Sequence, residues 1–181
     1  AGSEDNIRNL VALVVYYLTF DRFPALDRYR RPLYRYLLRL AGDEASANDW
    51  YQGAWEKVIR ARKSYKPKGP FRAWLFRVAH NHAMDDFRRS APLTGLDDAD
   101  AASTQPDPAE HALSAERAAR LADALSGLPP EQRDAMLLKL EGGLDLETIA
   151  RVTGVGRETA KSRLRYATAR LKQALSGERT E

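Results

Sequence analysis

Apolar residues recur at helical spacing along almost the whole sequence, and this periodicity limits the possible fold more than any other feature. Residues three and four apart share one face of a helix, whereas strict alternation of apolar and polar residues is typical of a strand. The sequence contains no convincing alternating run of β-branched residues. We therefore predict an all-α chain. The helices expected in its first half cover residues 6–20, 24–41, 46–63 and 70–90.

Residues 91–108 interrupt the helical pattern. This segment is rich in Pro, Asp and Ala, and it has too few large apolar residues to bury a core. We expect it to be a flexible acidic linker between two small helical domains. The predicted divisions are a first domain over 1–91, a linker over 92–108 and a second domain over 109–181.

Charge is distributed unevenly along the chain. Residues 1–90 hold 17 Lys/Arg and 10 Asp/Glu. Residues 91–116 hold no Lys/Arg and 6 Asp/Glu, and residues 117–181 hold 12 Lys/Arg and 9 Asp/Glu. Basic blocks favour the binding of polyanions such as nucleic acids. We therefore expect two polyanion-binding modules, joined by an acidic segment that contacts a basic surface.

Several other classes of protein do not fit the composition. The absence of cysteine excludes disulfides and cysteine-ligated metal sites, and it suits a reducing cytosol, so we expect a cytoplasmic location. The longest apolar run, residues 10–20, is shorter than the roughly 20 residues that cross a membrane. We expect a mostly buried helix there and no membrane association. Docking of that helix to a partner protein is the alternative.

The sequence offers no catalytic apparatus, so we do not expect an enzyme, a metal, a cofactor or a small-molecule substrate. His80 and His82 flank Asn81 and together resemble a nuclease motif. Residues two apart on a helix point about 200° apart, so the two imidazoles could not share one metal ion. No glycine-rich phosphate loop or activated serine is present either.

The most specific pattern lies in residues 144–172. Asp145 is a suitable N-cap for a short helix, Gly154 suits a left-handed turn, and a longer basic helix begins at Arg157. This order is typical of a helix-turn-helix, whose second helix lies in the major groove of DNA. The side chains expected to read duplex DNA are Arg157, Glu158, Lys161, Ser162 and Arg165. An antiparallel helical hairpin with a solvated outer face is the alternative interpretation.

Aromatic and basic residues are interleaved over residues 60–90. Cations follow the phosphates of a nucleic acid, and aromatic rings stack on unpaired bases. The pattern indicates a site for single-stranded nucleic acid. The residues expected in its basic loop are Lys63, Ser64, Tyr65 and Lys66. We expect Phe71, Trp74, Leu75 and Val78 to be core residues instead.

Both halves of the sequence resemble one known family. Residues 71–89 contain Phe-x-x-Trp-Leu, then Asn four residues before Asp, then Arg-Arg, and they resemble region 2 of extracytoplasmic-function sigma factors. Residues 47–55 resemble the helix that precedes this signature. Residues 128–171 resemble region 4 of the same family, beginning at Leu-Pro-Pro-Glu-Gln-Arg.

The resemblance implies a non-enzymatic protein that carries core RNA polymerase to promoters. The second domain would read the duplex −35 element and contact the polymerase flap, and the linker would occupy the basic RNA-exit channel. The residues expected to bind the clamp helices of the polymerase are Asp49, Gln52, Trp55 and Glu56. The residues expected at the melted −10 element, besides the basic loop, are Asn81, Arg88 and Arg89.

The sequence departs from the family pattern on the helix expected to bind the clamp. Asn48 and Gly53 stand where the family often has glutamate. Fewer acidic residues would weaken that contact. Phosphorylation of Ser46 would add about −1.5 to −2 charges beside them, so we hypothesise a phosphoswitch at this serine.

Other functions remain open at this stage. A stand-alone helix-turn-helix regulator, which binds duplex DNA without directing polymerase, is the first alternative. An enzyme that acts on nucleic acid is the second. The sequence also leaves open whether an anti-sigma factor controls the chain.

Overall fold

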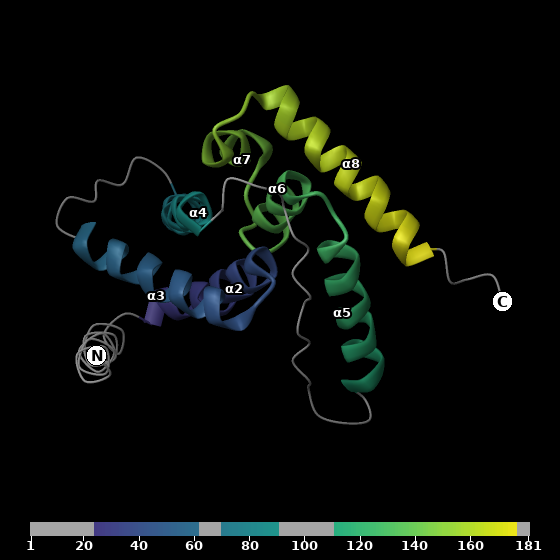
Figure 1. Ribbon diagram of the computed structural model, residues 1–181, viewed down its shortest axis with the longest axis horizontal. Coiled ribbons are helices and arrows are strands. Elements are labelled where there is room, and N and C mark those ends of the chain that lie inside the picture. Colours follow the sequence, from purple (N-terminus) through teal and green to yellow (C-terminus); the bar gives the residue numbers. More distant parts are fainter. Residues whose placement is uncertain (1–23, 62–69, 91–110, 177–181) are drawn as a thin grey trace.

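The computed structural model describes residues 24–61, 70–90 and 111–176, and within these ranges every regular element is an α-helix. The first helical group consists of α2 (Pro24–Ala41), α3 (Glu44–Ala61) and α4 (Phe71–Ser90) (Figure 1). The second helical group consists of α5 (His111–Ser126), α6 (Pro130–Leu140), α7 (Leu146–Thr153) and α8 (Arg157–Ser176). The all-α prediction is confirmed. The helix expected over 6–20, the basic loop and the whole of the predicted linker lie outside the described residues.

Local signals explain where most helices begin and end. α2 has the predicted bounds, and α6 begins with Pro130 at its first position, where a missing N–H costs nothing. α3 begins two residues earlier than predicted because Asp43 accepts a hydrogen bond from the Ser46 backbone N–H at 2.8 Å. α8 begins at Arg157, as predicted, and extends to Ser176. None of these helices is long and apolar enough to cross a membrane.

The core of the first helical group is built from one apolar stripe on each helix. The stripe on α2 follows the helical spacing i, i+3, i+4, i+7 and faces the other two helices. The buried apolar residues of this core are Leu33, Tyr36, Leu37 and Leu40 on α2, Ala47, Trp50, Ala54, Trp55 and Val58 on α3, and Leu75, Phe76, Ala79 and Ala83 on α4.

The second helical group is arranged around α6, which packs against α7 and α8. Five consecutive residues of α6, from Asp134 to Leu138, are buried. A helix that is apolar on more than one face has to be covered on more than one side. Helices α7 and α8 do not cover all of the buried surface of α6.

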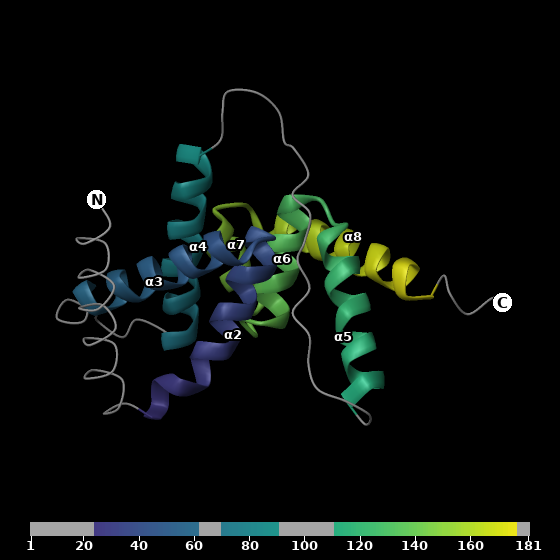
Figure 2. The same cartoon turned by 60° about the horizontal axis from the view of Figure 1, so that its bottom comes forward.

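The two helical groups pack directly against each other (Figures 1 and 2). Helix α2 contacts α6 and α5, while α4 contacts α7. The additional cover that α6 requires therefore comes from the first group, and the buried side chains form one continuous cluster. The sequence led us to expect two tethered modules and did not predict this contact.

Candidate nucleic-acid interface

The turn between α7 and α8 has the geometry of a helix-turn-helix. The Asp145 carboxylate accepts a hydrogen bond from the Thr148 N–H at 2.8 Å, which confirms it as the N-cap of α7. This backbone hydrogen bond holds the pKa of Asp145 below its usual value. Gly154 ends α7 with φ of 67°, in the left-handed region that the sequence predicted for it. The turn therefore fixes the angle at which α8 leaves α7.

Small and apolar side chains hold α8 against the rest of the second group. Ala160 and Ala167 are fully buried, Leu171 is nearly so, and Leu164 is half-buried. These four residues are spaced i, i+4, i+7 and i+11, so they form one inner stripe along α8. Val155 in the turn also packs on the core. The opposite face of α8 consequently points away from the core.

That outer face carries most of the side chains predicted to read duplex DNA. Arg157, Glu158, Lys161 and Arg165 are exposed, and Ser162 is half-buried. Arg157 bonds to Glu147 and to Glu158, and Lys161 lies 3.8 Å from Glu158. Exposed ion pairs of this kind are worth only about 0–1 kcal/mol, so these cations remain available to an incoming polyanion.

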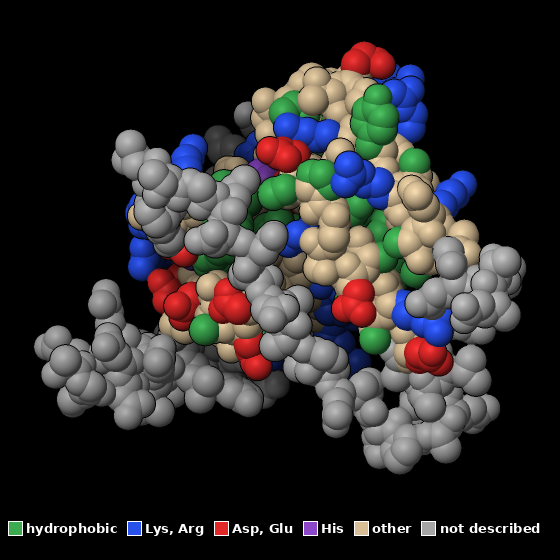
Figure 3. Space-filling model, turned by 45° about the vertical axis from the view of Figure 1, so that its right-hand side comes forward, with side chains coloured by type: hydrophobic (Ala, Val, Ile, Leu, Met, Phe, Trp, Pro, Cys, Tyr) green, Lys and Arg blue, Asp and Glu red, His purple; other side chains and the backbone are tan. Residues whose placement is uncertain are grey.

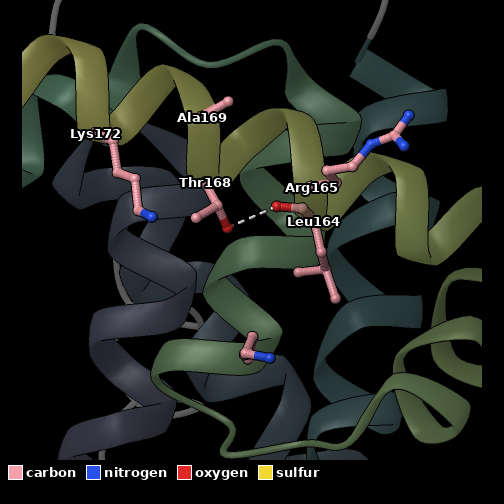
Figure 4. A pocket seen from close by; sticks show the side chains of 6 residues that line it. Leu164, Arg165, Thr168, Ala169 and Lys172 are labelled. Atoms are coloured by element: carbon pink, nitrogen blue, oxygen red, sulfur yellow. Dashed lines mark hydrogen bonds between the residues drawn. The ribbon is translucent and has the colours of Figure 1, made fainter.

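The row of Lys and Arg side chains on the outer face of α8 continues beyond the residues predicted to read duplex DNA. A shallow pocket of about 380 Å³ lies between α6 and α8, with a half-buried leucine in its wall (Figure 4). Its lining residues are Lys139, Leu164, Arg165, Thr168, Ala169 and Lys172. The Thr168 hydroxyl donates to the Leu164 carbonyl at 2.8 Å. The guanidinium of Arg165 lies over the Tyr166 ring, 4.9 Å from its centroid.

Sequence reasoning missed Lys139 and Lys172 as members of this basic surface. Lys172 follows Arg165 by two helical turns, so extending the spacing of the stripe would have found it. Lys139 is brought to the pocket only by the packing of α6 on α8. The space-filling view shows Lys and Arg side chains on this side of the molecule, interspersed with apolar and a few acidic groups (Figure 3).

The residues expected at the −10 element lie on the second half of α4. Asn81, Arg88 and Arg89 are all exposed. Arg88 bonds to Asp85, and Arg89 lies 3.4 Å from Asp86. The hydrogen bond from Arg88 lowers the pKa of Asp85. The other residues predicted for this element, from Lys63 to Lys66, lie outside the described residues.

The residues expected to bind the polymerase clamp divide into two sets on α3. Asp49 is exposed, and Gln52 and Glu56 are half-buried on the same face, with 3.4 Å between the Gln52 amide nitrogen and a Glu56 carboxylate oxygen. Trp55 is only 3% exposed and packs edge-on against Tyr51 in the core. Ser46 lies half-buried in the first turn of α3. Trp55 therefore supports the helix from inside.

The packing of α4 on α3 explains one departure from the family pattern. A Cβ atom on Gly53 would lie 1.9 Å from Nε2 of His82, so the imidazole occupies the space where another residue would place its side chain. Partial burial lowers the pKa of His82. Asn48, the other departure, is exposed and has no comparable explanation in the packing.

His80 and His82 face different neighbours, as the helical spacing predicts. His82 covers Gly53 on α3, whereas His80 is buried beside Tyr36 and Asp134. In the described ranges, no group of three or more His, Cys, Asp or Glu side chains could hold a metal ion.

Two family models match the chain, one in each half. Sigma-70 region 2 matches residues 25–92, and sigma-70 region 4 matches residues 118–171. In solved structures, the chain is similar to the sigma factor RpoE of Bartonella quintana, determined in complex with the anti-sigma factor NepR. The TM-score is 0.67 at 23% identity, covering 88% of this chain and 99% of that one. The fold is also similar to that of CnrH, determined with the cytosolic domain of CnrY (TM-score 0.58, 22% identity, 85% and 86% coverage).

Curated relatives extend the similarity to the level of sequence. The ECF RNA polymerase sigma factor SigL of Mycobacterium tuberculosis is 36% identical over 156 residues, which cover 82% of this chain and 85% of SigL. The RNA polymerase sigma factor CarQ of Myxococcus xanthus is 31% identical over 144 residues, covering 77% and 80%. Region 2 thus precedes region 4 in this chain, and both belong to one family. The chain is therefore a member of the extracytoplasmic-function (ECF) RNA polymerase sigma factors.

Proposed function

We propose that this chain is a non-enzymatic cytoplasmic sigma factor that binds core RNA polymerase and directs initiation at particular promoters. The observation that carries the proposal is the outer face of α8, where exposed cations stand on a helix fixed by a capped turn. That face occurs in a chain whose other half matches sigma-70 region 2. A stand-alone helix-turn-helix regulator does not need a region 2 domain, so this alternative function is not favoured.

We assign the −35 duplex to α8. Arginine and lysine can bond to guanine edges, and glutamate can accept a hydrogen bond from cytosine. Arg157, Lys161 and Arg165 recur at every fourth residue, so they present one row of cations to the groove. Lys139 and Lys172 extend this row toward the DNA backbone, where cations bind phosphates without reading sequence.

We assign the polymerase clamp to the exposed face of α3. Asp49, Gln52 and Glu56 would make the contact, and Trp55 would hold the helix in position from the core. The phosphoswitch at Ser46 remains a prediction. Its phosphate would lie in the first turn of α3, where the helix dipole favours negative charge. A Ser46→Ala chain that transcribes normally in cells would exclude the switch.

The remaining assignments concern partners. We propose that Asn81, Arg88 and Arg89 contact the melted −10 element together with the basic loop, and that the acidic linker passes through the RNA-exit channel. An anti-sigma factor is a further proposed partner, because the RpoE structure similar to this chain contains one.

Reconstituted transcription tests the proposal. Core polymerase mixed with the chain should initiate at a matched promoter, whereas neither component alone should do so. Arg165→Ala should weaken binding to the −35 duplex by about 1–3 kcal/mol if the guanidinium contacts a base. Arg170→Ala removes an equal charge from another face of α8 and serves as the control. A chain that binds duplex DNA alone and never supports initiation would contradict the proposal.

A further inference from the structure

An exposed tyrosine lies on the surface of α8. The Tyr166 side chain is 53% exposed, more than any other large apolar side chain among the described residues. It follows Ser162 by one helical turn, so it lies at the edge of the face predicted to read duplex DNA. The buried residues of α8 are Ala160, Ala167 and Leu171, so the packing of this helix does not depend on the Tyr166 ring. Its role is therefore to be found in its surface contacts.

Tyr166 contacts the guanidinium of Arg165 in two ways. The guanidinium carbon lies over the ring, 4.9 Å from its centroid. Nη2 of Arg165 also donates a hydrogen bond to the Tyr166 hydroxyl at 3.2 Å. The Arg165 side chain extends away from those of Thr168 and Lys172 (Figure 4). At an exposed site, a cation stacked on a ring shifts an equilibrium by about 2- to 5-fold. This is enough to favour one orientation of a long side chain.

Arg165 differs in its partner from the other cations of the same row. Arg157 and Lys161 lie 3.3 Å and 3.8 Å from the carboxylate oxygens of Glu158. A carboxylate neutralises part of the charge, and an incoming polyanion has to compete with it. Among the described residues, the polar contacts of Arg165 are with the neutral Tyr166 instead. Arg165 is therefore held by a partner that leaves its positive charge intact.

The contact also leaves the hydrogen-bonding edge of the guanidinium available. A guanidinium carries five N–H donors in one plane, and stacking on a ring uses its flat face rather than these donors. The Tyr166 hydroxyl accepts from only one of the terminal nitrogens of Arg165. Two donors are enough for a bidentate bond to O6 and N7 of guanine in the major groove. A guanidinium held by Tyr166 can therefore still read this base.

Ordering of the arginine before binding affects both affinity and base preference. A long side chain loses rotamer freedom when it is fixed against a base, and this loss opposes binding. A side chain that is already ordered in the free protein loses less. The benefit applies only to a base that suits the held orientation, so it raises the preference for that base as well as the affinity.

We propose that Tyr166 is a positioning residue for Arg165 and that Arg165, held in this way, reads a guanine in the −35 duplex. The ring and the hydroxyl of Tyr166 hold the guanidinium, and its remaining N–H donors bond to O6 and N7 of the base. The DNA-reading part of this inference rests on the proposed function. The contact between the two side chains is a property of the free chain, so it can be tested without DNA.

Nuclear magnetic resonance of the free chain tests the contact. The Nε–Hε resonance of Arg165, identified by its absence from Arg165→Ala, should be shifted by the ring current of Tyr166. Tyr166→Phe keeps the ring and should keep most of the shift, whereas Tyr166→Ala should abolish it. Leu175→Ala removes another exposed apolar side chain from α8 and should leave the resonance unchanged. An Arg165 resonance that is the same in Tyr166→Ala as in the original chain would overturn the inference.

Promoter binding tests the positioning role. The full chain, combined with core polymerase, is titrated with promoters in which each G·C pair of the −35 element is replaced in turn by A·T. The original chain should prefer guanine at the pair that Arg165 contacts. Tyr166→Ala should reduce this preference by about 2- to 5-fold, whereas Tyr166→Phe and Leu175→Ala should retain most of it. The salt dependence of binding should not change in any of these variants, because none of them loses a charge.

A double-mutant cycle separates positioning from direct contact between Tyr166 and DNA. In an Arg165→Ala background, Tyr166→Ala should cause no further loss of guanine preference, because no guanidinium remains to be held. An equal loss in both backgrounds would show that Tyr166 acts on the DNA independently, and the positioning role would be wrong. Circular dichroism should show the same helical content in every variant, because both positions are exposed.

The two tests distinguish a failure of this inference from a failure of the proposed function. Tyr166→Ala could move the Arg165 resonance while Arg165→Ala leaves promoter binding unchanged. The base contact assigned to Arg165 would then be wrong, and only the side-chain contact would stand. If instead Arg165→Ala abolishes the guanine preference and Tyr166→Ala leaves it intact, α8 reads the duplex as proposed, but Tyr166 does not position the guanidinium.

Discussion

Gly154 and Gly156 stand two positions apart in one turn, yet a side chain would have different effects at each. No atom lies within 4 Å of a Cβ placed on either glycine, so crowding is not the issue. Gly154 has a φ of 67°, which costs an L-residue about 1–2 kcal/mol. Gly154→Ala should lower the free energy of unfolding by about that amount. Urea unfolding measures it.

Gly156 provides the matched control in the same turn. Its carbonyl accepts the first hydrogen bond of α8, from the Ala160 N–H at 3.0 Å, which is the position of an N-cap. Serine is preferred to glycine there. Gly156→Ser should therefore leave stability unchanged or raise it slightly. Equal losses from both substitutions would show that the left-handed conformation is not what Gly154 supplies.

At the scale of elements, the packing of α4 on α3 depends on the pair of Gly53 and His82. Gly53→Ala places a methyl group against the imidazole and should cost about 1–3 kcal/mol, as overpacking does. His82→Ala combined with it should recover part of that loss, because the smaller side chain leaves room. A double-mutant cycle in urea unfolding measures the coupling.

A third glycine tests whether this effect is specific to the crowded position. A Cβ on Gly127 would meet only ordinary contacts, at 3.7 and 3.8 Å. Gly127→Ala should therefore be close to neutral. The alternative result is that the costs of Gly53→Ala and His82→Ala simply add. The imidazole would then not compete with the new methyl group. In that case the His82 ring does not explain why Gly53 stands where the family often has glutamate.

Elements were predictable wherever a local signal exists. The bounds of α2, the Asp145 cap and the Gly154 turn all follow from spacing and from residue preference, and the structure bears them out. The pocket beside α8 was not predictable in the same way. Lys139 belongs to α6, and nothing near it in sequence shows that α6 packs beside Lys172.

At the scale of the whole molecule, the sequence reveals the two helical groups but not their contact. Tyr36, His80 and Asp134 are far apart in the chain, and each has an ordinary interpretation when considered alone. The tyrosine fits an apolar stripe, the histidine belongs to a rejected nuclease motif, and the aspartate is one of many acids. Only the folded chain brings them within hydrogen-bonding distance, because long-range packing of buried polar groups leaves no local pattern.

The buried contact of Tyr36 with Asp134 and His80 predicts how the stability of the fold responds to alkaline pH. Burial, followed by the nearby Asp134 carboxylate, raises the pKa of Tyr36 well above its usual value of 10.0. The folded chain therefore keeps a proton that the unfolded chain releases above about pH 10. This contribution to stability is fully present below about pH 10 and declines as pH rises further. The free energy of unfolding, measured in urea, should accordingly fall as pH increases from about 9 to about 11.

The Tyr36→Phe chain isolates this effect from other groups, because lysines and the other tyrosines titrate in the same range. Its free energy of unfolding starts lower, since Asp134 has lost one donor, but it lacks the hydroxyl whose proton links pH to stability. The original chain should therefore lose stability more steeply than the variant as pH rises, while circular dichroism without urea shows both still helical. Parallel curves would mean that the surrounding cations, not Tyr36, control stability at high pH.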